Sequence, residues 1–289
     1  MIRLKTHLGD YPGTAALRRG ELRSTLVDFD FVAIKPVSAG FKRVVRDLEF
    51  DLAELAIVTY LQAVDHGTPL VMLPIVVGPG RFQHQCLVHN SERGPLGAAD
   101  LAGKRLGTRS YSQTTPAWIR AFLQHDYGVA PQAMQWITFE DAHVAAVRDP
   151  PFVTRAPSKQ DLTGMLLAGE VDAMIIGNDA PTDPRIQPVI TDHVAAAKSW
   201  ARAHHAVPIN HVIVIEGELA NARPEIVTEL TRLFAHSKLL GSASVVPFDM
   251  LPQGADAMHT ALDLIAGYAF EQGLLRRRIS ADELLQPRG

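Results

Sequence analysis

Residues 100–129 contain a strand, a polar loop and a helix in succession, and this order constrains the fold more than any other part of the sequence. Lys104–Thr108 predicts a short strand, and a hydroxyl-rich loop follows it. Thr115 as the N-cap and Pro116 as the first helical residue predict a helix start, and Gly128 predicts a left-handed residue at its end. Free N–H groups and the helix dipole favour an anion at such a start, for example a carboxylate or phosphate.

Strands alternate with helices along the chain, which predicts an α/β fold with a mainly parallel sheet flanked by helices. Leu70–Val77 is a continuous apolar run, typical of a buried parallel strand. Pro224–Leu240 has apolar residues at helical spacing, which predicts a long helix. The charged tail Arg276–Gly289 is expected to be peripheral.

Two predicted crossings of the chain indicate two lobes. A polar connection begins near Asn90, and the strand near Val207 should return to the first lobe. We therefore expect a discontinuous lobe 1 of residues 1–90 and 208–289, a lobe 2 of residues 91–207, and a ligand cleft between them.

The composition limits the classes of partner. With 289 residues, 47% of them hydrophobic and 20% charged, and a net charge of −3, the chain resembles an ordinary globular protein and argues against binding to nucleic acid or to a membrane surface. Cys86 is the single cysteine, so an intramolecular disulfide is impossible. Met1–His7 lacks a signal-peptide core and no apolar run is long enough to cross a membrane, so we expect a cytoplasmic protein. The sequence is compatible with a homo-oligomer.

Several motifs together resemble the 4,5-dihydroxyphthalate decarboxylase family. They include D-L-x-G-K at Asp100–Lys104, T-x-x-W-x-R at Thr115–Arg120, R-F-x-H at Arg81–His84 and P-I-x-H at Pro208–His211. The resemblance implies a two-lobed fold of the type II periplasmic-binding-protein kind. It also implies non-oxidative loss of one carboxylate from a dihydroxylated phthalate, which leaves a dihydroxybenzoate such as protocatechuate, without an organic cofactor.

Three side chains are candidates for the catalytic chemistry. His211 and His84 can each move a proton near neutral pH, and Glu54 can polarise a hydroxyl or orient a histidine. Each has a structural alternative: a histidine packed in a strand, or a solvated acid on a strand edge. The sequence does not decide which histidine donates the proton.

The candidates for substrate binding are residues that can hold a carboxylate. Arg81 can grip it with two parallel hydrogen bonds, and Ser110, Thr114 and Thr115 offer hydroxyls and N–H groups. The alternatives are a surface arginine and ordinary helix capping. The remaining expected substrate contacts lie within the matched motifs or the loop between them: Tyr111, Trp118, Arg120 and Asn210.

A metal site is not expected. His84, His89, His211 and Glu54 could in principle converge, but their spacing matches no helical metal-binding pattern. Trp136 is followed by Ile137-Thr138 instead of the family's glycine-bearing continuation, which bears on substrate identity. The rival hypothesis is a solute-binding protein of the same fold that captures a small carboxylate or aromatic acid without chemistry. A cytoplasmic ligand-sensing domain is a third interpretation.

Overall fold

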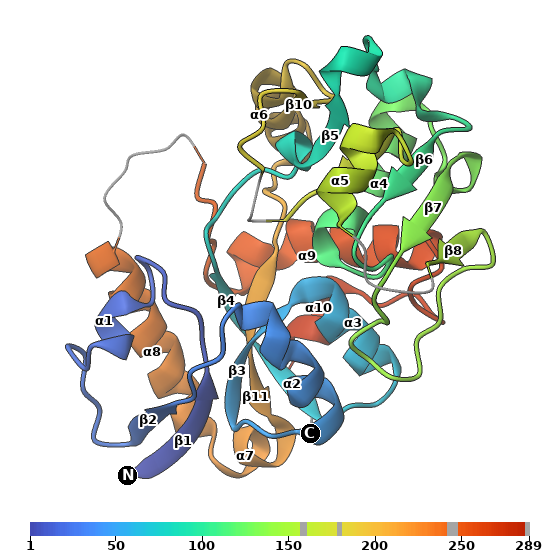
Figure 1. Cartoon of the computed structure of the whole chain (residues 1–289). Helices are drawn as coiled ribbons and strands as arrows, with labels where there is room; N and C mark the ends of the chain where they lie inside the picture. Colours follow the sequence, from blue (N-terminus) through green and yellow to red (C-terminus); the bar gives the residue numbers. More distant parts are fainter. Residues whose placement is uncertain (157–160, 178–180, 242–247, 287–289) are drawn as a thin grey trace.

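The strands of this protein form two separate sheets. We describe a computed structural model, which covers residues 1–156, 161–177, 181–241 and 248–286. Figure 1 shows the sheets in two parts, one above the other. We call the part built on the five-stranded sheet lobe 1 and the part built on the six-stranded sheet lobe 2. The predicted α/β class is confirmed.

The sheet of lobe 1 has the strand order β2-β1-β3-β11-β4. Its first three strands in chain order pair in parallel, whereas β11 is antiparallel to both β3 and β4. A strand from the C-terminal third of the chain therefore lies between two strands from the first third. The strands are β1 (Ile2–His7), β2 (Val27–Phe31), β3 (Leu52–Ala56), β4 (Leu70–Val77) and β11 (His211–Glu216).

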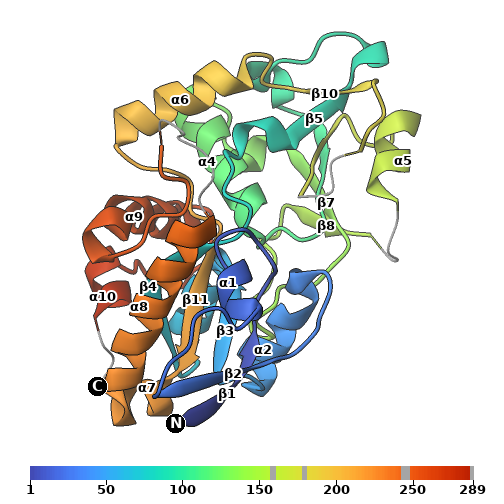
Figure 2. The ribbon, with the colours of Figure 1, turned by 90° about the vertical axis from the view of Figure 1, so that its left-hand side faces the viewer.

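Helices cover both faces of this sheet because successive strand residues point to opposite sides. Ile213 packs with apolar residues of α1 and α8, whereas Val212 and Val214 belong to a core with α2, α3, α9 and α10. Figure 2 shows α8 and α2 on opposite sides of the sheet. The helices are α1 (Ala15–Arg18), α2 (Phe41–Asp47), α3 (Ile57–Asp65), α7 (Gly217–Ala222), α8 (Pro224–Gly241), α9 (Ala255–Glu271) and α10 (Ala281–Leu285).

The expectation that Arg276–Gly289 is peripheral is wrong for its middle part. Ile279, Ala281 and Leu284 are all buried, and they join the same core as α9. The charged composition of this segment gave no sign of its buried residues, because only one side of the short α10 is apolar. Residues 287–289 lie outside the described residues.

The sheet of lobe 2 has the strand order β10-β5-β9-β6-β7-β8, with β5 and β10 antiparallel to their neighbours. Because β5 belongs to this sheet, the chain changes sheet before Leu87, earlier than the crossing after Asn90 that we expected. The elements are β5 (Leu87–Asn90), β6 (Arg105–Gly107), α4 (Thr114–Tyr127), β7 (Gln135–Thr138), β8 (Val153–Arg155), α5 (Leu162–Ala168), β9 (Ala173–Ile175), β10 (Ile186–Pro188) and α6 (His193–His204).

Helix α4 begins two residues earlier than predicted. Gln113 is its N-cap, so neither Thr115 as the cap nor Pro116 as the first residue is right. The hydroxyl of Thr115 instead donates to Gln83 Oε1 at 2.9 Å, so it has a tertiary partner in place of a capping bond. Proline is tolerated here because the first turn of a helix needs no internal N–H donor. Gly128 has φ +70°, as predicted for a C-terminal left-handed residue.

The two lobes share one hydrophobic core through α4. Trp118 is fully buried, and its ring lies edge-on to Trp200 of lobe 2 and to Tyr268 of α9. Its indole N–H donates to the carbonyl oxygen of Ile209 at 2.8 Å. That bond fixes the segment that leads into β11 against lobe 2.

We expect Trp118→Phe to lower the free energy of unfolding by about 1–3 kcal/mol, because the buried Ile209 carbonyl loses its donor and the smaller ring leaves a gap. Urea unfolding measures this loss. Trp136→Phe is a matched control, since that buried indole also donates to a carbonyl at 2.8 Å, but to nearby Pro131. Hydrogen exchange in residues 207–212 should quicken only in the Trp118 variant. Equal exchange in both variants would contradict the proposed link.

Candidate functional site

A cavity of about 600 Å³ lies between the lobes. Lobe 1 contributes the loop after β1, the segment before α2 and the start of β11. Lobe 2 contributes the loop before α4, the start of α4 and the chain after β9. Ligands of α/β proteins bind at such junctions, beyond the carboxyl ends of parallel strands.

Glu54 and His211 meet at the edge of the sheet that faces this cavity. The register pairs Ile213 with Glu54 and His211 with Ala56, so both polar side chains point to the Ile213 face of neighbouring strands. His211 Nδ1 lies 2.6 Å from Glu54 Oε1. Glu54 has no exposed surface, whereas His211 lines the cavity. With Nδ1 facing the carboxylate, Nε2 is the ring nitrogen left for a ligand.

Three donors surround the buried Glu54 carboxylate. Besides His211, the Tyr11 hydroxyl donates to Oε1 at 2.9 Å and the Gly9 N–H donates to Oε2 at 2.8 Å. Burial opposes ionisation, but His211 and these bonds hold the pKa of Glu54 below its usual value. Burial and the nearby Glu54 raise the pKa of Tyr11, so its phenol stays a donor. The carboxylate is therefore charged and fixed.

The start of α4 forms the opposite wall. The helical ladder begins with the Ala117 N–H donating to the Gln113 carbonyl at 3.0 Å, so the earlier N–H groups have no acceptor inside the helix. Thr114 and Thr115 line the cavity, and Thr114 Oγ1 accepts from the Val58 N–H at 3.2 Å. This wall therefore favours negative charge.

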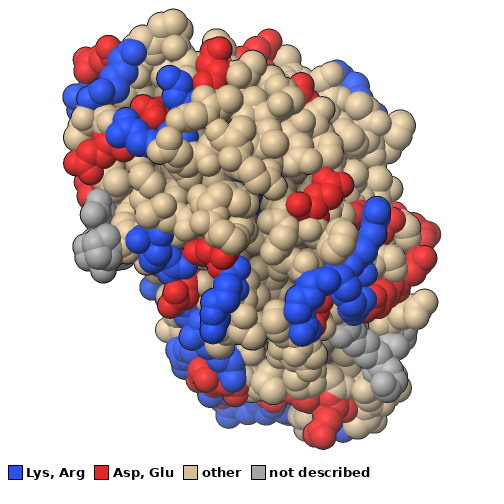
Figure 3. Space-filling model, turned by 90° about the vertical axis from the view of Figure 1, so that its right-hand side faces the viewer, with Lys and Arg blue, Asp and Glu red and all other residues tan. Residues whose placement is uncertain are grey.

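Among the described residues around the cavity, basic side chains outnumber acidic ones. Arg18, Lys35, Arg81 and Arg109 line it, and Asp10 is the acid in the described part of the lining. Arg18 Nη1 donates to the Leu8 carbonyl at 2.6 Å, Arg109 pairs with Glu140 at 2.9 Å, and Arg81 contacts Cys86. This excess of basic side chains is a property of the cavity lining. On the face seen in Figure 3, acidic and basic side chains lie close together. An anion is the natural ligand.

A second histidine lines this cavity, although the sequence analysis did not single it out. His143 lies in the connection between β7 and β8, and its Nδ1 is 2.7 Å from Thr59 Oγ1 of α3. Tyr11 was missed as well. The strand β1 that ends just before Tyr11 was a usable signal, because ligands bind beyond strand ends. The same signal applies to His143, which follows the end of β7.

The structure does not bring His84 to the cavity. The segment before β5 forms a 3₁₀ turn at His84–Cys86, and the His84 ring stacks on Phe122 with centroids 4.0 Å apart. It is buried, and burial, with the charge of nearby His193, lowers its pKa to about 4. Arg81 thus lines the cavity, whereas the His84 ring packs on Phe122 in the interior.

The remaining predicted contacts divide between the cavity and the buried interior around α4. Asn210 lines the cavity, whereas Ser110, Tyr111, Trp118 and Arg120 do not. The fully buried Arg120 guanidinium lies 3.7 Å from the Tyr111 ring centroid and donates to Gln272 and to the Tyr111 carbonyl. Ser110 Oγ is 3.2 Å from Ser112 Oγ. In the described chain, no three His, Cys, Asp or Glu side chains group in a way that could hold a metal ion.

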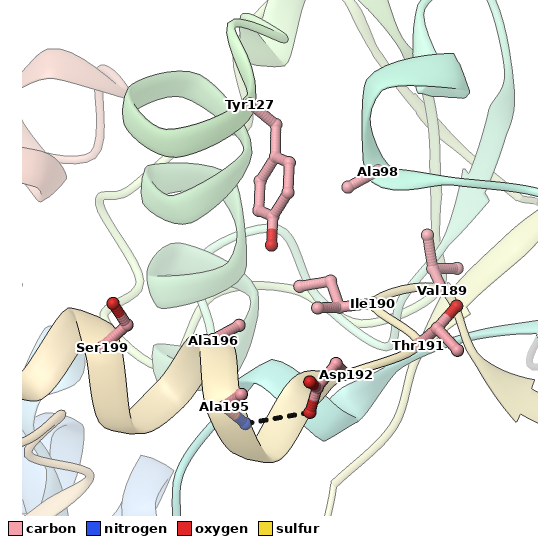
Figure 4. A pocket seen from close by; sticks show the side chains of 9 residues that line it. All are labelled: Ala98, Tyr127, Val189, Ile190, Thr191, Asp192, Ala195, Ala196 and Ser199. Atoms are coloured by element: carbon pink, nitrogen blue, oxygen red, sulfur yellow. Dashed lines mark hydrogen bonds between the residues drawn. The ribbon is translucent and has the colours of Figure 1, made fainter.

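A second depression, of about 470 Å³, lies on lobe 2 between the end of α4 and α6 (Figure 4). Its lining is mostly small and apolar, and the Tyr127 hydroxyl points into it. Asp192 caps α6 through the Ala195 N–H at 3.2 Å, so its carboxylate already has a partner. This depression has no group of titratable side chains comparable to the Glu54–His211 pair.

Known structures with this architecture define the class of fold. The periplasmic aliphatic sulphonate binding protein SsuA from Escherichia coli aligns with 98% of this chain and 96% of its own, with a TM-score of 0.60 and 12% identity. The desulfurization enzyme DszB aligns with 99% of this chain and 97% of its own, with a TM-score of 0.53 and 15% identity. The fold is that of periplasmic-binding-protein-like proteins. No helix in the described ranges is long and apolar enough to span a membrane.

Sequence relatives narrow this class to one family. A 4,5-dihydroxyphthalate decarboxylase from Comamonas testosteroni is 30% identical over 251 residues, which cover 82% of this chain and 75% of the relative. One from Pseudomonas putida is 32% identical over 216 residues, 70% of this chain and 82% of the relative. No protein-family model matches the sequence. The chain belongs to the 4,5-dihydroxyphthalate decarboxylase family.

The burial of His84 predicts how the free energy of unfolding depends on pH. Its pKa is about 4 in the folded protein, below the usual 6.5, so the unfolded chain binds more protons between these values. Stability is therefore full above pH 6.5 and falls as the pH drops toward 4, by about 3 kcal/mol from this residue. Urea unfolding at pH 7 and pH 4.5 should show a smaller loss for His84→Gln than for the wild type. Equal losses would contradict the assignment.

Proposed function

We propose that this chain is a carboxy-lyase that converts 4,5-dihydroxyphthalate to protocatechuate and CO₂. The observation that carries the proposal is the buried Glu54–His211 pair, which opens into a cavity with a positive bias. Membership of a family whose relatives are named for this reaction supports the substrate. The reaction is non-oxidative.

The substrate carries two carboxylates, and the cavity offers positive groups from both lobes. Arg81 and the start of α4 hold the carboxylate that stays, through the guanidinium, the Thr114 and Thr115 N–H groups and the helix dipole. Fixing this group orients the ring and brings the second carboxylate toward lobe 1. Arg18 lies on that side and balances its charge.

His211 delivers the proton that replaces the lost carboxylate. The ring carbon that bears the leaving group takes a proton from Nε2, and the hydroxyl para to this carbon supplies electron density. The bond to the carboxyl carbon then breaks, its electron pair stays with the ring, and CO₂ leaves. Water restores the proton on His211. The dianionic substrate and one proton thus give the monoanionic product and CO₂.

Glu54 acts through His211. Its bond to Nδ1 fixes the plane of the imidazole and selects Nε2 as the nitrogen that faces the substrate. Tyr11 and Gly9 fix the carboxylate in turn. Glu54 is therefore a positioning residue.

Incubation with 4,5-dihydroxyphthalate should release CO₂ and one equivalent of protocatechuate. Gas detection measures the CO₂, and chromatography measures the protocatechuate. Decarboxylation in deuterated water should place one deuterium on the ring, because the new hydrogen comes from an exchangeable site on His211. Tight binding without CO₂ release would refute the enzyme and support the solute-binding alternative.

We expect His211→Gln to lower kcat by about 10²- to 10⁴-fold, the usual range for a lost proton donor. Glu54→Gln should lower kcat with a smaller change in KM, because it disturbs the orientation of the donor and leaves the cavity cations in place. His84→Gln is the matched control and should keep nearly full turnover at pH 7, since His84 lies outside the cavity. Turnover by His211→Gln at the wild-type rate would remove His211 from this role.

A further inference from the structure

We propose that His143 is a specificity-determining residue that binds a ring hydroxyl of the substrate from lobe 2, on the cavity wall that it shares with His211. The inference rests on the proposed function, since it assigns the recognition of one substrate group within the same cavity. It concerns binding, so it can be tested whether or not the protein turns the substrate over.

His143 is held in place by lobe 1, although it belongs to the chain of lobe 2. Figure 1 shows the connection between β7 and β8 descending from lobe 2 toward α2 and α3. Arg46 of α2 donates from Nε to the His143 carbonyl at 2.7 Å and from Nη2 to the Ala142 carbonyl at 2.9 Å. Thr59 of α3 holds the ring at Nδ1. Backbone and ring are therefore both positioned across the lobe boundary.

The His143 ring shares a wall of the cavity with His211. It lies edge-on to Phe41 with centroids 5.5 Å apart, and the His211 ring lies edge-on to the same phenyl at 5.3 Å. Both histidines and Phe41 line the cavity. With Nδ1 bonded to Thr59, Nε2 is the polar ring atom left to meet a ligand, and it has no bonding partner among the described residues.

The chemistry of His143 suits a hydroxyl better than a carboxylate. Burial, with the charges of Lys42, Arg109 and Arg46, lowers its pKa to about 4, although Glu140 acts in the opposite direction. The ring is neutral near pH 7, so it lacks the charge with which the cavity's cations hold carboxylates. A phenolic hydroxyl can donate and accept, so it bonds to Nε2 in either tautomer, whereas a carboxylate can only accept.

Two substitutions separate this role from a merely structural one. The amide of glutamine can reach the place of Nε2, whereas the amide of asparagine can reach only that of Nδ1. His143→Asn keeps a partner for Thr59 and should bind 4,5-dihydroxyphthalate about five- to tenfold more weakly than the wild type, as expected for one lost hydrogen bond. His143→Gln should bind it more tightly than His143→Asn does.

Phthalate, which lacks both hydroxyls, is the control ligand. Calorimetry should show that its Kd changes less than twofold in either variant, so the loss is specific to the hydroxylated ligand. Equal weakening of both ligands, or tighter binding by His143→Asn than by His143→Gln, would overturn the proposal, because either result shows that the residue only shapes the junction of the lobes. Should neither variant fold, Thr59→Val is expected to give the same hydroxyl-specific loss, and an equal loss for phthalate would overturn the proposal.

The two hypotheses fail in different ways. Wild-type protein that binds 4,5-dihydroxyphthalate more tightly than phthalate but releases no CO₂ would refute the enzymatic function and leave the role of His143 standing. Wild-type protein that releases CO₂ while the His143 variants keep the full preference for the hydroxylated ligand would refute the role of His143 alone.

Discussion

The buried carboxylate of Glu54 is the constraint on which the site depends. Removing an unpaired charge from water costs several kcal/mol, so the fold must supply donors wherever Glu54 lies. Those donors are Gly9, Tyr11 and His211, and they come from the loop after β1 and from the first residue of β11. Three segments far apart in the chain are thereby held together at one point. Any loosening of this point would leave a buried charge without partners.

This arrangement gives a role to the strand from late in the chain that lies inside the first sheet. β11 sits between β3 and β4, so its first residue reaches the cavity directly beside Glu54. Trp118 holds the preceding segment against lobe 2. The return crossing therefore joins the lobes and also presents the histidine. The fold alone does not imply chemistry, because sulphonate-binding proteins share it. The chemical argument comes from the side chains at the crossing.

Part of this site was predictable from sequence, and the reasons are local. His211 begins β11 at the end of the sheet that faces the cleft, and residues at such ends could be singled out from sequence, as Arg81, Thr114, Thr115 and Asn210 were. Glu54 lies in the middle of β3 and was a candidate for its side chain alone. His84 could not be placed, since its direction depends on whether the chain after Gly80 is a strand or a 3₁₀ turn. Arg120 belongs to a matched motif and Tyr111 to the loop before it, but both pack in the protein interior. A motif residue maintained for packing looks the same in a sequence as one maintained for binding.

The sequence by itself determined the alternation of strands and helices, the two-lobed class and the end of α4 at Gly128, because periodicity, propensity and backbone freedom act over a few neighbouring residues. Only the tertiary structure decided that β5 belongs to lobe 2, that Tyr11 completes the shell around Glu54 and that His143 reaches the cavity. These outcomes depend on pairings across as many as 97 positions, as in the bond from Arg46 to the His143 carbonyl. Long-range contacts are set by the packing of whole elements, and no local pattern of residues encodes them.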